Sequence, residues 1–137
     1  MKKLLLTLFT LIFSLMLFAQ ENLYADSKIK VQFSVEQHKD PVNDYFHEYY
    51  AFKITNTSQN QVSFIPVFKY VTDTGEQLSS AKRDENSLIL LAPGESIVGD
   101  LVNHKNLTLF KQFLVGNSSK RSSESTYTIK SATINYQ

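Results

Sequence analysis

The sequence contains no cysteine and no tryptophan, and only 4 of its 137 residues are glycine. Without a thiol the chain cannot form a disulfide, a cysteine zinc site, a cysteine nucleophile or an iron–sulfur centre. The glycines are not spaced as in a phosphate-binding loop, and no Gly-x-Ser-x-Gly nucleophile turn occurs. The sequence therefore predicts neither a catalytic centre nor a cofactor.

The charge of the chain is nearly balanced, with 14 Lys and Arg against 13 Asp and Glu. A nucleic-acid-binding domain normally carries a clear excess of basic residues on one face. We therefore expect no nucleic-acid partner. The length is that of one domain, and it is sufficient to bury a hydrophobic core without covalent cross-links.

The first residues have the pattern of a secretory signal peptide. Lys2 and Lys3 precede an uncharged run from Leu4 to Phe18, about fifteen residues, which is shorter than the roughly twenty needed to span a bilayer. We predict cleavage after Ala19, with Ala25 as the alternative site, and a retained membrane anchor as the competing interpretation. The mature protein is then secreted or periplasmic, and it meets the membrane only transiently, through the signal peptide at residues 1–19.

The mature chain reads as a series of strands. Residues 20–28 are polar and small, which predicts a flexible lead, and residues 29–137 form a single domain. Ile29, Val31, Phe33 and Val35 alternate with polar residues, which indicates a half-buried strand. Turn-forming residues between positions 38 and 47 predict a long loop, and alternation resumes at residues 50–55.

Four further apolar segments follow, at residues 62–72, 87–91, 97–101 and 126–136. In the last segment the apolar positions shift from Tyr127 and Ile129 to Ala132 and Ile134, which predicts a bulge. The segment near 104–115 fits a short helix or a strand equally well. About seven short strands separated by turns predict an all-β, immunoglobulin-like antiparallel β-sandwich. The Cys, Trp and Cys residues typical of antibody domains are absent.

Three segments within residues 50–101 carry a family resemblance. They are Phe52–Ser58, Val62–Gly75, which includes Phe68–Asp73, and Leu90–Ser96. A strand ending in Asn-Thr-Ser, a long apolar strand and a Leu-x-Pro-Gly-Glu turn resemble secreted bacterial immunoglobulin-like domains of the FxLYD type. The resemblance implies a β-sandwich with an exported accessory or binding role, and it implies no catalytic residues.

Aromatic residues are concentrated around the first predicted loop. Tyr45, Phe46 and Tyr49 lie close to Tyr50, which alternation places toward the core. Exposed aromatic faces stack on sugar rings or anchor protein partners. Tyr45, Phe46 and Tyr49 are therefore the predicted ligand-binding residues. The alternative is that these side chains cover the open end of the sandwich.

The same loop contains potential metal ligands. Two imidazoles and several carboxylates within a short stretch could bind zinc or copper through nitrogen and oxygen, or calcium through the carboxylates. The candidate ligands are His38, Asp40, Asp44, His47 and Glu48. Their spacing matches no rigid metal-binding template, and an exposed acidic loop explains them equally.

Together these observations predict an exported, non-catalytic binding or accessory module that contacts a protein or glycan partner. The alternative is a periplasmic metal-binding protein that uses His38, His47 and the nearby carboxylates. A hydrolase of an unrecognised type is a third hypothesis. The sequence leaves the oligomeric state and the identity of the ligand open.

Overall fold

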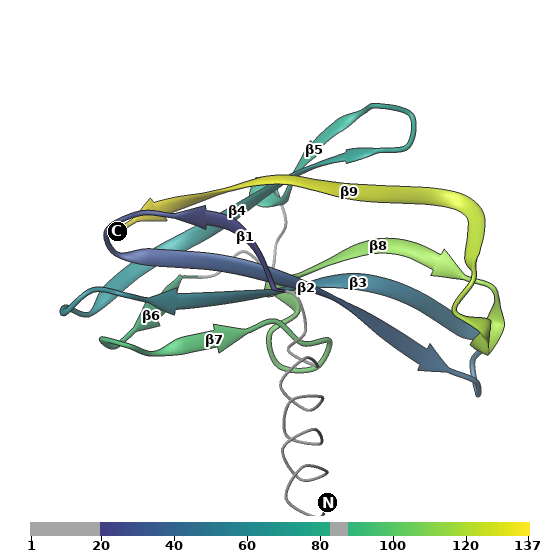
Figure 1. Ribbon diagram of the computed structural model, residues 1–137, viewed down its shortest axis with the longest axis horizontal. Coiled ribbons are helices and arrows are strands. Elements are labelled where there is room, and N and C mark those ends of the chain that lie inside the picture. The colour runs from purple at the N-terminus through teal and green to yellow at the C-terminus, as the bar shows by residue number, and fades with distance from the viewer. Residues whose placement is uncertain (1–19, 83–87) are drawn as a thin grey trace, which may run out of the picture.

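The computed structural model describes residues 20–82 and 88–137, so the predicted signal peptide at residues 1–19 lies outside the described part of the chain. Within that part the chain forms nine strands and three single 3-10 turns (Figure 1). The strands are β1 (Glu21–Ala25), β2 (Ile29–Asp40), β3 (Tyr45–Asn56), β4 (Val62–Thr72), β5 (Gln77–Ser79), β6 (Ile89–Leu91), β7 (Ser96–Val98), β8 (Thr108–Leu114) and β9 (Arg121–Tyr136). The 3-10 turns are η1 (Ser80–Lys82), η2 (Lys105–Leu107) and η3 (Gly116–Ser118).

The strands belong to one antiparallel sheet in the order β1-β2-β3-β8-β9-β4-β5, with β6 against β4 and β7 against β3. The predicted all-β, antiparallel class is therefore confirmed. The long strand β9 pairs with β8 at Arg121 and Thr126 and with β4 from Tyr127 to Tyr136. Through β9 the sheet curls over its own core, so its two halves are one continuous sheet (Figure 1).

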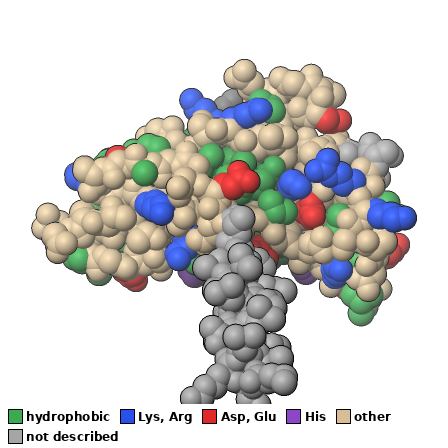
Figure 2. Space-filling model, viewed as in Figure 1, with side chains coloured by type: hydrophobic (Ala, Val, Ile, Leu, Met, Phe, Trp, Pro, Cys, Tyr) green, Lys and Arg blue, Asp and Glu red, His purple; other side chains and the backbone are tan. Residues whose placement is uncertain are grey.

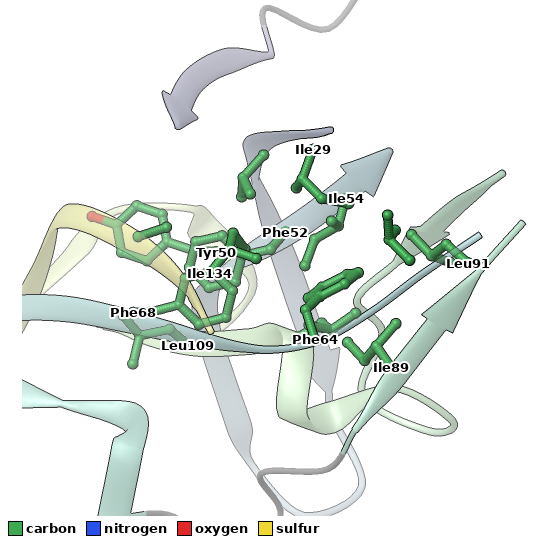
Figure 3. Packing of buried hydrophobic residues seen from close by; sticks show 14 residues of the cluster. Ile29, Tyr50, Phe52, Ile54, Phe64, Phe68, Ile89, Leu91, Leu109 and Ile134 are labelled. Atoms are coloured by element: carbon green, nitrogen blue, oxygen red, sulfur yellow. The ribbon is translucent and has the colours of Figure 1, made fainter. Parts of the chain in front are cut away.

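The core lies between the two halves of the curled sheet. Phe52 of β3 and Phe68 of β4 stack face to face, with ring centroids 3.7 Å apart and planes 7° from parallel. Ile29, Ile54 and Phe64 belong to the same buried cluster, and none of them is exposed to solvent (Figure 3). Complete burial of such a side chain contributes about 1.5–3 kcal/mol, so the hydrophobic effect favours the closed curl of the sheet.

The predicted flexible lead at residues 20–28 is wrong, because residues 21–25 form β1. This strand pairs with β2 from Glu21↔Phe33 to Ala25↔Lys30. Leu23 and Tyr24 pack against the core. In the sequence these two residues stand among polar and small ones, and a single apolar pair is too short to show the alternation that indicates a strand.

The predicted long loop between residues 38 and 47 is also wrong. β2 continues to Asp40, β3 begins at Tyr45, and the two strands pair without interruption from Ile29↔Asn56 to Asp40↔Tyr45. The connection is a turn at residues 41–44 in which Asp44 adopts a positive φ of 51°. The hairpin therefore extends well beyond the core, at the right of Figure 1.

Two further expectations concern the last third of the chain. The segment near 104–115 contains one 3-10 turn, η2, followed by β8, so the strand alternative applies to most of it. The predicted bulge in the terminal strand is confirmed, because Lys69 pairs with Ser131 whereas Tyr70 pairs with Ile129. Lys130 is the extra residue.

None of the described residues belongs to a helix that is long and apolar enough to cross a membrane. On the face shown in Figure 2, basic and acidic side chains are interspersed. This distribution agrees with the balanced composition of the chain.

Candidate functional site

The turn of the β2–β3 hairpin is held by the side chain of Asp40. Its carboxylate accepts hydrogen bonds from the backbone amides of Val42 (3.1 Å) and Asn43 (3.2 Å), and from the Asn43 side chain (2.7 Å). The two hydrogen bonds from Asn43 are the main reason that the pKa of Asp40 is lowered. This arrangement is an Asx-type turn, and it fixes the register in which the two strands continue.

Tyr45, His47 and Tyr49 point to one face of β3, because alternate residues of a strand share a face. His38 lies directly opposite His47 on β2. The ring centroid of His47 is 5.2 Å from that of His38, 4.7 Å from Tyr45 and 5.9 Å from Tyr49. The hairpin thus brings together four rings that lie up to eleven positions apart in the sequence.

β8 adds two more rings to this group. Phe110 stacks beside His47 with centroids 6.0 Å apart, and Phe113 meets Tyr45 edge-on at 5.9 Å. We call His38, Tyr45, His47, Tyr49, Phe110 and Phe113 the aromatic cluster. Edge-on and offset ring contacts of this kind each contribute about 0.5–1.5 kcal/mol beyond area burial, so the cluster stiffens the hairpin.

A pocket of about 420 Å³ opens beside the aromatic cluster. Its lining residues are His38, Tyr45, His47, Tyr49, Leu101, Lys105, Thr108 and Phe110. We call it the aromatic pocket. Its volume lies within the range of small-ligand sites, about 300–1,000 Å³.

The wall of the pocket opposite the hairpin comes from residues 99–108. The backbone amide of Gly99 donates to the carbonyl oxygen of Phe52 at 2.8 Å, and a Cβ atom added at Gly99 would collide with the Leu107 carbonyl. Further along, the Asp100 carboxylate accepts the amides of Val102 and Asn103. Close backbone packing and this second Asx-type turn place Leu101 and Lys105 against the aromatic cluster.

His47 forms the buried part of the pocket lining. Only 6% of this residue is exposed, and its Nδ1 atom has no hydrogen-bond partner among the described residues. Burial, followed by the nearby charge of His38, lowers the pKa of the imidazole. The neutral form of His47 is therefore favoured, which suits a ring packed among other rings.

Tyr45 and Tyr49 differ in their surroundings. Tyr45 is 43% exposed at the mouth of the pocket, whereas Tyr49 is half-buried. Burial, and then the carboxylates of Glu36 and Asp100, raise the pKa of Tyr49. Lys105 lines the same pocket as these two tyrosines.

Phe46, which was predicted together with Tyr45 and Tyr49 as a ligand-binding residue, does not share their face of the sheet. It follows Tyr45 directly, so its side chain points to the opposite face of β3, where only 8% of the residue is exposed. Glu48 points to that same face. Its carboxylate accepts hydrogen bonds from Lys111 (2.9 Å), Gln112 and Gln37 (3.2 Å).

The structure does not bring together the predicted metal-ligand set of His38, Asp40, Asp44, His47 and Glu48. Asp40 is used in the turn, Asp44 adopts the left-handed turn conformation, and Glu48 lies on the other face of the sheet. No group of three or more metal-ligating side chains occurs within residues 20–82 and 88–137. His38 and His47 alone would supply fewer ligands than the four of a structural zinc site.

A second and larger pocket, about 630 Å³, lies near the β4–β5 hairpin. It is lined by Lys69, Tyr70, Val71, Gln77, Leu78, Ser79, Lys130 and Ser131. We favour the aromatic pocket as the candidate site because several rings and polar groups converge there, whereas the larger pocket contains a single aromatic residue.

Four pocket residues, Leu101, Lys105, Thr108 and Phe110, were not predicted from the sequence. They lie more than fifty positions after Tyr49 in the sequence, and nothing in a single sequence indicates that they line a pocket together with the β2–β3 hairpin. No protein-family model matches the chain, and no match was found among curated proteins or among solved structures. The candidate site therefore rests on the geometry of the chain itself.

Proposed function

We propose that the chain is an exported, non-catalytic binding module that recognises a partner through the aromatic pocket. One observation carries the proposal: the exposed ring of Tyr45 lines a pocket together with the buried side chain of His47. Large aromatic rings contribute much of the binding energy at recognition sites and lose little conformational entropy on binding. An aromatic face on a stiff hairpin is thus suited to recognition.

The contacts of the histidines support binding rather than catalysis. His38 and His47 contact each other and the neighbouring tyrosine rings. His104 pairs with the Asp100 carboxylate at 3.1 Å, within the wall of the pocket. These imidazoles are thus engaged in ring packing and in a turn.

Export is proposed from the sequence of residues 1–19, which has the charged start and the short apolar run of a signal peptide. The resemblance of residues 50–101 to FxLYD-type domains supports the same role, because those domains are exported accessory or binding modules. The proposed location is the periplasm or the cell exterior.

The proposal can be tested with the protein recovered from cells that express the full chain. The fluorescently labelled protein is incubated with a cell-envelope preparation from the source organism, and the bound fraction is measured as a function of concentration. We expect saturable binding that is lost in a Tyr45→Ala, Tyr49→Ala double variant. Val42→Ala serves as the control, because Val42 is 90% exposed on the same hairpin and does not line the pocket.

A further inference from the structure

We infer that the ligand of the aromatic pocket is a carbohydrate, and that one uncharged sugar ring stacks on Tyr45. The inference rests on the proposed function and specifies the class of partner. It is carried by the size of the pocket, by its open aromatic face and by the mixture of polar groups around it.

The size of the pocket favours a compact ligand. A stable protein–protein interface covers about 800 Å² on each partner, which requires a broad surface. The aromatic pocket is instead an open hollow of about 420 Å³ with eight lining residues. A single sugar unit is small enough to pack against this lining, whereas a stable protein–protein interface needs about 20–30 residues on each side.

The aromatic face fits a sugar ring. The face of a pyranose carries C–H groups with a slight positive charge, and the face of a tyrosine ring carries negative charge density. Tyr45 presents such a face at the mouth, and Tyr49 and Phe110 continue the aromatic lining inward. The contacts from Tyr45 to His47 and Phe113 hold its ring in place before a ligand arrives, which lowers the entropic cost of binding.

The polar groups around the pocket include both donors and acceptors. Lys105 lines the pocket as a donor, and the lining residues Tyr45 and Tyr49 carry hydroxyl groups that donate and accept. Each sugar hydroxyl also both donates and accepts, so it can use both kinds of partner.

The first test uses four defined probes: chitotriose, maltotriose, cellotriose and mannotriose. Each is titrated into the ¹⁵N- and ¹³C-labelled protein, and the ring signals of Tyr45, Tyr49 and Phe110 are followed by NMR. We expect at least one trisaccharide to shift these signals saturably. Absence of any shift with all four probes at millimolar concentration would count against the inference.

Variants of Tyr45 separate stacking from other contacts. We expect Tyr45→Ala to weaken trisaccharide binding about tenfold, and Tyr45→Phe, which keeps the ring, to change it by no more than about threefold. Val42→Ala should bind as the unaltered protein does. Because Tyr45 is exposed, Tyr45→Ala should stay folded, and its amide spectrum verifies this. Equal affinities of the Ala and Phe variants would overturn stacking on Tyr45.

Treatment of the envelope preparation distinguishes failure of this inference from failure of the proposed function. Periodate cleaves vicinal diols of sugars, whereas a protease removes protein partners. If binding depends on Tyr45, is lost after periodate and survives protease, the carbohydrate assignment is supported. If it depends on Tyr45 but is lost only after protease, the proposed function stands and the carbohydrate assignment is wrong. Binding that does not depend on Tyr45 or Tyr49 contradicts both.

Discussion

Tyr136, in the last strand of the chain, donates a hydrogen bond from its hydroxyl group to the Asp26 carboxylate at 2.7 Å. Asp26 lies in the turn between β1 and β2, and the same carboxylate accepts from the Tyr24 hydroxyl and from the amides of Lys28 and Ile29. One acidic group therefore joins the two ends of the domain. Burial opposes its ionisation, but these hydrogen bonds lower the pKa of Asp26 to about 2.

The stabilisation by Asp26 should depend on pH. Because the pKa is lowered from 3.8 to about 2 on folding, the ionised form stabilises the native state above pH 4, and this contribution is lost as the pH falls through about 2. Asp26 is exposed, so screening by solvent limits the effect to about 1 kcal/mol. We expect Asp26→Asn to lower the free energy of unfolding by this amount at pH 7 and by less at pH 2, as measured by urea unfolding. Asp73→Asn, in another turn, is the control.

Asn56 should be the most sensitive polar residue of the fold. It is fully buried, and its side-chain amide donates to the carbonyl oxygens of Asn60 (2.7 Å), Leu91 (3.1 Å) and Ala92 (3.1 Å). Asn56→Ala leaves these carbonyls without their donor inside the protein, so we expect a loss of about 3 kcal/mol in the free energy of unfolding. Thermal and urea unfolding measure it. Asn60→Ala should have little effect, because Asn60 contributes only its backbone to this contact; equal losses in the two variants would contradict the assignment.

His47 should make the domain less stable in mild acid. Its pKa is lowered on folding, mainly by burial, so the unfolded chain takes up a proton first as the pH falls. The stabilisation is therefore complete above about pH 6.5 and decreases from there toward the lowered pKa of the folded state. His47→Phe keeps a ring and removes the proton site, so its free energy of unfolding should change less between pH 7.5 and 5. Parallel pH profiles of the two proteins would show that His47 is not responsible.

Zinc and copper should leave the stability of the domain unchanged. An ion that binds the native state raises the melting temperature, and within residues 20–82 and 88–137 His38 and His47 belong to no group of three or more metal-ligating side chains. We expect no shift with one equivalent of either ion, and no shift on adding a chelator. A stoichiometric increase that disappears in a His38→Ala, His47→Ala double variant would restore the metal-binding hypothesis.

The mature protein should begin at Gln20. Cleavage after the alternative residue, Ala25, would remove β1, whose Leu23 and Tyr24 pack against the core. It would also remove the Tyr24 hydrogen bond to Asp26. The intact mass of the protein recovered from the periplasm or the culture medium decides between the two sites. A mass that corresponds to a chain starting at Asp26 would show that β1 is dispensable.

Much of the fold could be predicted from local sequence patterns. Alternation from Ile29 to Val35 identifies the inner half of β2, and the change of phase between Ile129 and Ala132 identifies the bulge in β9. The turn at residues 92–95 also follows from its residues, since Gly94 adopts a positive φ of 75°. These features depend on short-range chemistry, which a single sequence records directly.

The site was only partly predictable. Asp40, Asn43 and Asp44 indicate a turn, but composition does not distinguish a tight hairpin from a long loop, so the pairing of His38 with His47 was missed. That pairing decides which side chains share a face, and it separates Tyr45 from Phe46. The contact of Phe110 with His47 depends on the pairing of β3 with β8, which no local pattern encodes.

The position of β9 has a consequence for the order in which the sheet assembles. This strand joins β8 to β4 and so connects the two halves of the sheet. Contacts between parts of a chain that are distant in sequence form slowly, and the pairing of β9 with β4 is such a contact. We therefore expect the β2–β3 hairpin, which pairs neighbouring segments, to form before β9 closes the sheet over its core.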